Sequence, residues 1–213
     1  MSNSTDTLLL IAPGCPHCQS VLNSLSTLVK NGDIGRLEVV NISIYPEIAT
    51  EAGTRSVPWI RIGKYELSGN YTAGELKSWV EKAASDVAGK AYIRELLEQQ
   101  QLDKAIDYIG NDSTHLTELL ELMQDEDSSL SVKFGIGAIF EALESTEALV
   151  RAISELGKLT QHEKPSLRAD AAYYLGLSHS PAAKPWLTRL KDDPQQDVRE
   201  IAEEALEALE SKS

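Results

Sequence analysis

A short apolar run near the start of the chain leads directly into a pair of cysteines. The run covers residues 7–12, ends at Pro13-Gly14 and is followed by Cys15-Pro16-His17-Cys18. A continuous apolar stretch of this length is typical of a strand that is buried on both faces. Pro16 suits a first helical turn, and apolar residues then recur at helical spacing as far as Asn31-Gly32. The sequence therefore predicts a strand and then a helix that holds both cysteines in its first turn.

More strands and helices follow up to about residue 88. The signals are, in order, a strand over 37–42, a short helix after Pro46, two strands over 59–62 and 65–68, and a last helix. Between those two strands, Gly63-Lys64 predicts a two-residue hairpin in which glycine supplies the positive φ of a type II′ turn. Thr72 and Glu75 form a capping box that opens the last helix. The predicted order is βαβαββα, so residues 1–88 are expected to form an α/β domain with a mixed sheet.

The strand signals disappear from residue 89 onward. Leucine and alanine recur at three- and four-residue spacing, and acidic segments such as Asp125-Glu126-Asp127 interrupt the pattern. Similar helical segments open at Val132-Lys133, Leu167-Arg168 and Val198-Arg199, so their basic positions are 35 and 31 residues apart. Each segment follows another apolar periodic stretch that predicts a partner helix. Residues 89–213 are therefore expected to form an all-α domain of helical-pair repeats.

Acidic residues are concentrated in the helical half. The formal net charge is −13, and residues 89–213 hold 13 Lys and Arg against 24 Asp and Glu, which is −11 of that total. Phosphate binding needs clustered Lys and Arg, so no nucleic-acid partner is expected. The excess of acid favours basic partners, although a helical surface that only has to stay hydrated would have the same composition.

The apolar runs also bear on localisation. None approaches the roughly 20 residues of a membrane span. The first six residues contain no Lys or Arg, and the apolar run behind them is short for a signal-peptide core. If Met1 is the true start, we expect a cytoplasmic protein without a membrane partner. Paired cysteines in that compartment are more often catalytic or metal-binding than structural.

The spacing of the two cysteines suits reversible disulfide chemistry. Cys15, at the helix start, would be the exposed nucleophile, because unpaired N–H groups and the helix dipole lower the pKa of a thiol there. Cys18, one turn into the helix and less accessible, would resolve the mixed disulfide that Cys15 forms with a substrate. His17 either stabilises the Cys15 thiolate, which would make the pair a stronger oxidant, or is a solvent-facing residue without that role.

The cysteine pair has two other candidate uses, metal binding and a purely structural role. A four-ligand zinc site within one subunit is disfavoured, because the chain has only two cysteines and its other histidines, His115, His162 and His179, belong to the helical half. A metal that bridges two subunits and an inert pair of buried thiols are the alternatives to redox chemistry. We expect neither a metal nor a cofactor.

The segment Pro13-Gly14-Cys15-Pro16-His17-Cys18, followed by Asn41-Ile42 and Val57-Pro58, resembles the thioredoxin superfamily over residues 5–85. Within that superfamily the chain is similar to the small thioredoxin- and glutaredoxin-like domains. The resemblance implies that Pro58 is cis and faces the cysteines, and that the main chain before it pairs with an extended substrate. A trans proline that simply starts a strand is the alternative.

The resemblance also suggests further site residues and shows some departures. Trp59 would flank the substrate groove or belong to the core, and Gly69 matches a glycine near the same groove. Thioredoxins carry a tryptophan before the first cysteine, and a buried aspartate with a nearby lysine that move the proton of the second cysteine. Gly14, Leu9 and Val39 stand at those places here. The proton route for the second cysteine is therefore expected to differ from that of thioredoxin.

In the helical half, residues 191–199 with Ala202, Ala205 and Leu206 resemble HEAT-like repeats. The resemblance implies about three stacked helical pairs, capped by residues 92–109, whose concave face binds other proteins. A plain helical bundle that stabilises the chain or forms a dimer is the alternative. No spacing of histidines and carboxylates in this half indicates catalysis.

Together these features predict a thiol–disulfide oxidoreductase that acts on protein disulfides through Cys15 and Cys18. A redox partner, either a reductase or an oxidant, would recharge the pair at Cys15. The helical repeats would bind a protein client. The alternative is an adaptor without turnover, whose repeats bind a partner and whose cysteine pair only senses the redox state.

Overall fold

The computed structural model describes residues 5–85, 88–112 and 114–211. The chain divides into two compact units, Met1–Ala88 and Gly89–Ser213. Residues 1–4, which contributed to the expectation that no signal peptide is present, lie outside the described residues. Within the described ranges, no helix has the length and apolar character needed to cross a membrane.

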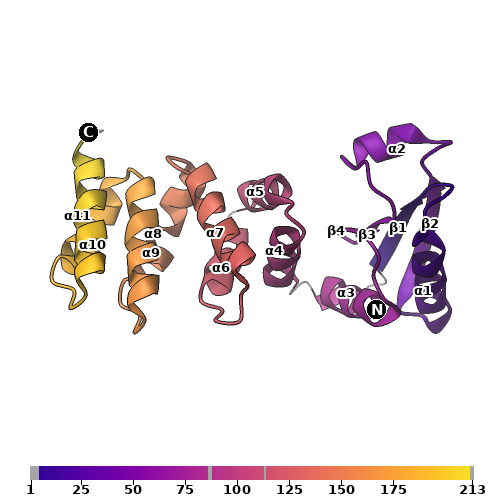
Figure 1. Cartoon of the computed structure of the whole chain (residues 1–213), viewed down its shortest axis with the longest axis horizontal. Helices are drawn as coiled ribbons and strands as arrows, with labels where there is room; N and C mark the ends of the chain where they lie inside the picture. The colour runs from indigo at the N-terminus through magenta and orange to yellow at the C-terminus, as the bar shows by residue number, and fades with distance from the viewer. Residues whose placement is uncertain (1–4, 86–87, 113, 212–213) are drawn as a thin grey trace. The chain divides into compact units, whose positions relative to one another are not determined.

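The first unit is built on a four-stranded mixed sheet (Figure 1). Its elements are β1 (Thr5–Ile11), α1 (Cys18–Asn31), β2 (Ile34–Asn41), α2 (Pro46–Glu51), β3 (Trp59–Ile62), β4 (Tyr65–Ser68) and α3 (Ala73–Ser85). The strand order is β2-β1-β3-β4, with β2 parallel to β1, and β3 antiparallel to both of its neighbours. The predicted βαβαββα order and mixed sheet are confirmed.

Strand β1 is central, and helices cover both of its faces. Leu8 and Leu10 share one face and cluster with Trp59 and with Ala49 of α2. Side chains alternate along a strand, so Leu9 points to the other face, where α1 and α3 contact the sheet and each other. Leu9 is fully buried. This two-sided packing is the arrangement that the continuous apolar run predicted.

Strand β2 differs from the prediction in its bounds and its burial. It begins at Ile34, before the apolar stretch over 37–42, and ends at Asn41. It lies at the edge of the sheet, and among its residues only Ile34 is buried. β2 pairs with β1 along its whole length, from Ile34 opposite Thr5 to Asn41 opposite Ile11. Main-chain hydrogen bonds therefore extend β2 to residues before the apolar stretch from which it was predicted.

The predicted turn and cap are both present. Ile62 pairs with Tyr65 across a two-residue hairpin, and Gly63 has a φ of 58°. Before α3, the Thr72 N–H donates to Glu75 Oε2 at 2.7 Å, and the Glu75 N–H donates to Thr72 Oγ1 at 3.3 Å. The backbone hydrogen bond from Thr72, followed by the side-chain one, lowers the pKa of Glu75. The hairpin lies beside the start of β1, since the Gly63 N–H donates to the carbonyl of Asp6.

In its described residues, the second unit consists of helices that stack in two layers (Figure 1). They are α4 (Gly89–Glu98), α5 (Leu102–Asn111), α6 (Thr114–Met123), α7 (Leu130–Ala142), α8 (Glu147–Leu159), α9 (Pro165–Leu177), the short η1 (Pro181–Ala183), α10 (Lys184–Leu190) and α11 (Gln196–Ser211). One layer runs α5, α7, α9, α11 through successive contacts, and α4, α6 and α8 begin the other. Each layer therefore takes one helix from each predicted pair.

The repeated positions occupy equivalent places in α7, α9 and α11. In each helix, the residue that lies three positions after the basic residue is buried. These residues are Ile136, Ala171 and Ala202. Between the second and third repeats, a buried ion pair joins Arg168 to Asp193, with Nε donating to Oδ2 at 2.7 Å. The hydrogen bond from Arg168 lowers the pKa of Asp193. The second unit is the predicted all-α repeat domain.

Candidate active site

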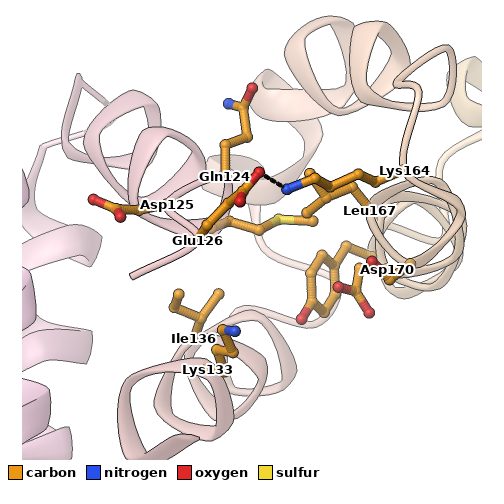
Figure 2. Close-up of a pocket in the computed structure, with 11 residues that line it drawn as sticks. Gln124, Asp125, Glu126, Lys133, Ile136, Lys164, Leu167 and Asp170 are labelled. Carbon is orange, nitrogen blue, oxygen red and sulfur yellow. Dashed lines mark hydrogen bonds and ion pairs between the residues drawn. The ribbon is translucent and has the colours of Figure 1, made fainter. Parts of the chain in front are cut away.

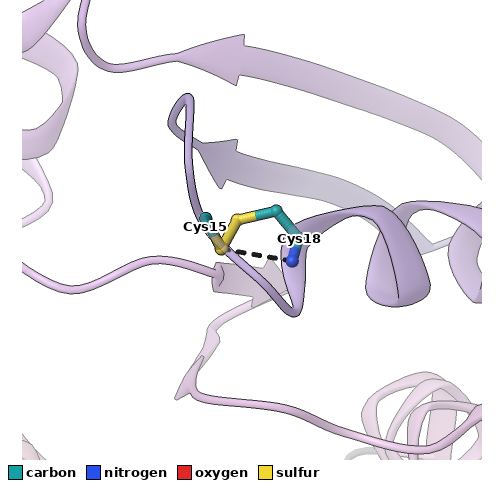
Figure 3. The surroundings of a disulfide bond; sticks show 2 residues. All are labelled: Cys15 and Cys18. Carbon is teal, nitrogen blue, oxygen red and sulfur yellow. Dashed lines mark hydrogen bonds between the residues drawn. A yellow bond between two sulfur atoms is a disulfide. The ribbon is translucent and has the colours of Figure 1, made fainter.

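A disulfide joins Cys15 and Cys18 just beyond the end of β1 (Figure 3). Their Cα atoms are 5.5 Å apart. Cys15 lies in the loop that leaves β1, and Cys18 is the first residue of α1. The short loop between the strand and the helix therefore brings both sulfurs together.

The helix begins later than predicted, so only Cys18 lies in its first turn. His17 is the N-cap, and its carbonyl accepts a hydrogen bond from Val21 N–H at 3.1 Å. Cys15 precedes the helix, and Pro16 and His17 form a turn. Amides of a first helical turn have no partner inside the helix, and the Cys18 N–H donates instead to Cys15 Sγ at 3.1 Å. The sulfur of Cys15 thus accepts a hydrogen bond from a helix amide, although Cys15 itself lies outside the helix.

The two cysteines differ in exposure. Cys15 is half-buried, whereas Cys18 is only 6% exposed. Cys15 is therefore the more accessible of the two cysteines.

The ends of all four strands bring further main-chain groups to this end of the sheet. Ile11 pairs with Asn41, Leu10 with Trp59, and Trp59 with Ser68. The loop with the cysteines, the loop after β2, the segment before β3 and the residue after β4 therefore leave the sheet at the same end.

The segment before β3 contains the expected cis proline. The Val57–Pro58 peptide bond is cis, and Pro58 is buried while Val57 is half-buried. Gly69, which has a φ of 119°, donates its N–H to the carbonyl of Pro58 at 3.0 Å. Within the described residues, the main-chain N–H and C=O of Val57 have no hydrogen-bond partner. That main chain is available to pair with another extended segment.

Trp59 does not flank a groove, contrary to one of the two roles considered for it. Its side chain is 0% exposed and packs in the cluster with Leu8 and Leu10 beneath α2. The reason is its place in β3, where it is paired with Leu10 of the central strand on the covered face of the sheet. Its side chain therefore belongs to the core and cannot contact a substrate.

Pro16 and His17 are both exposed in the turn between the cysteines. Among the described residues, no hydrogen bond joins the His17 side chain to either sulfur or caps the helix. A role for His17 in stabilising the thiolate stays a prediction.

The positions that hold the proton-shuttling pair in thioredoxins are apolar here and pair with each other. Leu9 of β1 lies opposite Val39 of β2 in the sheet register. Leu9 is fully buried, and Val39 is 39% exposed at the sheet edge. Neither position supplies a carboxylate or an ammonium group to Cys18.

Sequence reasoning missed two apolar residues at this end of the sheet. Ile44 and Tyr45, in the loop after β2, are 67% and 54% exposed. The sequence does contain a sign of them. Ile44 and Tyr45 are apolar, yet they lie after the predicted strand over 37–42 and directly before Pro46, where no buried strand is expected. They are exposed apolar side chains in a loop that leaves the sheet at the same end as the disulfide loop.

No metal centre is found in the described part of the chain, where no group of three His, Cys, Asp or Glu side chains could hold an ion. The candidate site comprises the Cys15–Cys18 pair, the main chain of Val57 and Pro58, and Gly69, which bonds to Pro58.

Comparison with known proteins agrees with this geometry. Residues 7–81 match the thioredoxin domain family, and residues 118–207 match HEAT repeats. The protein thus combines a thioredoxin domain, with its CXXC pair at Cys15 and Cys18, and a HEAT-repeat unit. It is also 28% identical over 137 residues to protein disulfide-isomerase TMX3 of Xenopus laevis. That alignment covers 58% of this chain and only 30% of the length of the relative.

Proposed function

We propose that the protein is a thiol–disulfide oxidoreductase that acts on protein disulfides. In the reducing direction, the Cys15 thiolate attacks one substrate sulfur and forms a mixed disulfide, and the other substrate sulfur leaves and takes up a proton. Cys18 loses its proton and attacks Cys15 Sγ, which releases the second substrate thiol. The Cys15–Cys18 disulfide forms, and two electrons pass to the substrate. The reverse steps oxidise a substrate dithiol.

The observation that carries this proposal is the hydrogen bond from the Cys18 N–H to Cys15 Sγ at 3.1 Å. In the reduced protein, the same amide would stabilise negative charge on Cys15, because it is a first-turn amide at the positive end of α1. Cys18 is only 6% exposed, which suits the resolving role. The two cysteines therefore take different parts in the reaction.

The substrate would bind as an extended segment beside Pro58. The unpaired main chain of Val57 supports this mode, because an extended peptide can add to it through main-chain hydrogen bonds. Main-chain pairing reads little of the substrate sequence, so the thioredoxin domain alone would accept many disulfides.

We also assign client binding to the HEAT-repeat unit. Leu130 and Phe134, one helical turn apart on α7, are 72% and 75% exposed, which supports a surface that contacts another protein. A client held by the repeats would reach Cys15 at a raised effective concentration, because both are on one chain. A separate reductase or oxidant would then recharge the cysteine pair.

Turnover is tested by insulin reduction with dithiothreitol as the electron source. The unchanged chain should accelerate reduction, and Cys15→Ser should return the rate to that of dithiothreitol alone. Ser20→Ala, an exposed change in α1 close to the pair, is the matched control and should keep the rate. Equal rates with and without the unchanged chain would overturn the proposal in favour of a redox-sensing adaptor.

A further inference from the structure

A groove of about 460 Å³ lies between the second and third repeats, on helices α9 and α11. Small residues form its floor where the two helices approach closely. A Cβ atom added to Gly176 would lie 2.9 Å from the Cβ of Ala205, so no larger side chain fits at that point. Ala169 and Ala208 extend the small apolar surface along the two helices. The groove is therefore open because its floor lacks long side chains.

The charged residues that line this groove are acidic. Glu144, Asp170 and Glu204 contribute carboxylates, and none of the residues that line the groove is a lysine or arginine. His179 is also part of the lining, and its Nε2 lies 2.6 Å from Glu144 Oε1. Within the described residues, neither Asp170 nor Glu204 forms an ion pair. Two carboxylates thus face the groove without a cation.

The neighbouring pocket, between the first and second repeats, has a different charge balance (Figure 2). It shares Asp170, but Lys133 and Lys164 also line it, and Lys164 forms an ion pair with Glu126. Among the residues that the structure describes, lysines therefore line one of these two adjoining pockets and not the other.

Asp170 and Tyr173 make the groove suitable for a cationic side chain with an apolar stem. Asp170 is accessible to water yet surrounded by protein atoms, and this partial desolvation raises its pKa. A cation beside it would reverse that effect. Tyr173 is 43% exposed next to it, so its ring can pack against an aliphatic stem or a guanidinium group.

We propose that the groove between α9 and α11 binds a basic segment of a protein client by receiving an arginine or lysine side chain. The stem would lie on Ala205 and Tyr173, and the charged head would meet Asp170 and Glu204. This inference rests on the proposed client-binding role of the HEAT-repeat unit and specifies the client as basic. The net charge of −11 on residues 89–213 would favour the approach of such a client.

The test measures fluorescence anisotropy of the full chain with a short labelled peptide of alanine and leucine that contains two arginines. The comparison peptide carries citrulline, which has nearly the same shape without the charge. We expect the arginine peptide to bind at least about tenfold more tightly. The double variant Asp170→Asn with Glu204→Gln should lose about tenfold in affinity for it.

The matched control is Glu203→Gln with Glu207→Gln, which removes the same charge from the part of α11 that lines a different pocket. It should change the affinity by less than about twofold. Equal losses in both double variants would show a diffuse acidic field and overturn the proposal. Equal binding of the two peptides, or no binding of either, would also overturn it.

Insulin reduction by the unchanged chain separates this inference from the proposed redox function. Absence of turnover together with selective arginine binding would count against the redox proposal alone. Turnover without selective binding would count against the groove alone. Circular dichroism of each double variant shows whether the helices are intact before affinities are compared.

Discussion

The thioredoxin domain and the HEAT-repeat unit use different parts of the polypeptide to build their sites. In the thioredoxin domain, main-chain groups dominate. The Cys18 N–H donates a hydrogen bond to Cys15 Sγ, and the Gly69 N–H donates one to the carbonyl of Pro58. In the HEAT-repeat unit, side-chain charges dominate: Asp170 and Glu204 line the proposed groove, and a buried ion pair joins Arg168 to Asp193 in the same unit. The difference teaches which substitutions each unit tolerates. In the first unit, the most damaging substitutions should be those that change backbone conformation. In the second, they should be those that remove a buried charge.

The strongest challenge to this comparison is to remove the buried arginine. Arg168 donates to both carboxylate oxygens of Asp193, at 2.7 and 2.8 Å, and also to the carbonyls of His162 and Glu163. Arg168→Ala leaves a buried carboxylate without its partner, so the free energy of unfolding of the HEAT-repeat unit should fall by about 3–5 kcal/mol. Urea denaturation followed by circular dichroism measures this change.

The control for that change is Arg151→Ala, which removes an exposed arginine that pairs with Glu147 one turn away. This substitution should cost no more than about 0.5 kcal/mol. A cost for Arg168→Ala as small as that of the control would contradict the importance given to the buried pair.

Acidification sharpens the same point. The Arg168 hydrogen bond lowers the pKa of Asp193 in the folded protein, so the unfolded chain binds this proton more readily. The stability that the carboxylate contributes is therefore present above its ordinary pKa and is lost as the pH falls below about 4. The stability gap between the unchanged protein and Asp193→Asn should shrink over that range. A gap that stays constant down to low pH would show that the charge is unimportant.

A backbone change tests the other side of the comparison. Gly69 has a φ of 119°, a conformation that side chains make costly, and open space lies around its Cα. Gly69→Ala should therefore destabilise the thioredoxin domain by about 1–3 kcal/mol through strain alone. Because its N–H bonds to Pro58, insulin reduction should slow as well.

Gly74→Ala is the control for that variant, because Gly74 also has open space around it but lies at the start of α3 without a positive φ. It should leave stability unchanged or raise it slightly. If the two alanine variants behave alike, conformation at Gly69 does not limit the site.

The smallest expected effect concerns the capping box of α3. Thr72→Ala removes the hydroxyl that accepts from the Glu75 N–H, and it should cost about 1 kcal/mol of stability. Thr27→Ala removes an exposed hydroxyl inside α1 that bonds to the Asn23 carbonyl, and it should cost almost nothing. A thermal denaturation series compares the two, and equal shifts would mean that the cap does not matter.

Local patterns in the sequence predicted most of the fold. The apolar run over residues 7–12 corresponds to the central strand, Gly63 to the hairpin, and Thr72 with Glu75 to the cap of α3. The repeated basic positions lie in successive packed helices α7, α9 and α11. These features were predictable because each depends on neighbours in sequence.

Features that depend on tertiary contacts were not predictable in the same way. The start of α1 at Cys18 depends on the turn at Pro16 and His17, between the two cysteines. The burial of Trp59 depends on the packing of α2 against the sheet. The groove on α9 and α11 arises from small residues that are far apart in sequence, such as Gly176 and Ala205. No local pattern contains that information.

The central claim, that Cys15 is the nucleophile and Cys18 resolves, is tested most directly by trapping. Cys18→Ser and Cys15→Ser are each incubated in reduced form with a disulfide-bonded peptide, and the products are analysed by mass spectrometry without reductant. Cys18→Ser should accumulate a mixed disulfide through Cys15 that dithiothreitol releases, and Cys15→Ser should form little or none. An adduct that forms mainly in Cys15→Ser, or in neither variant, would contradict the account.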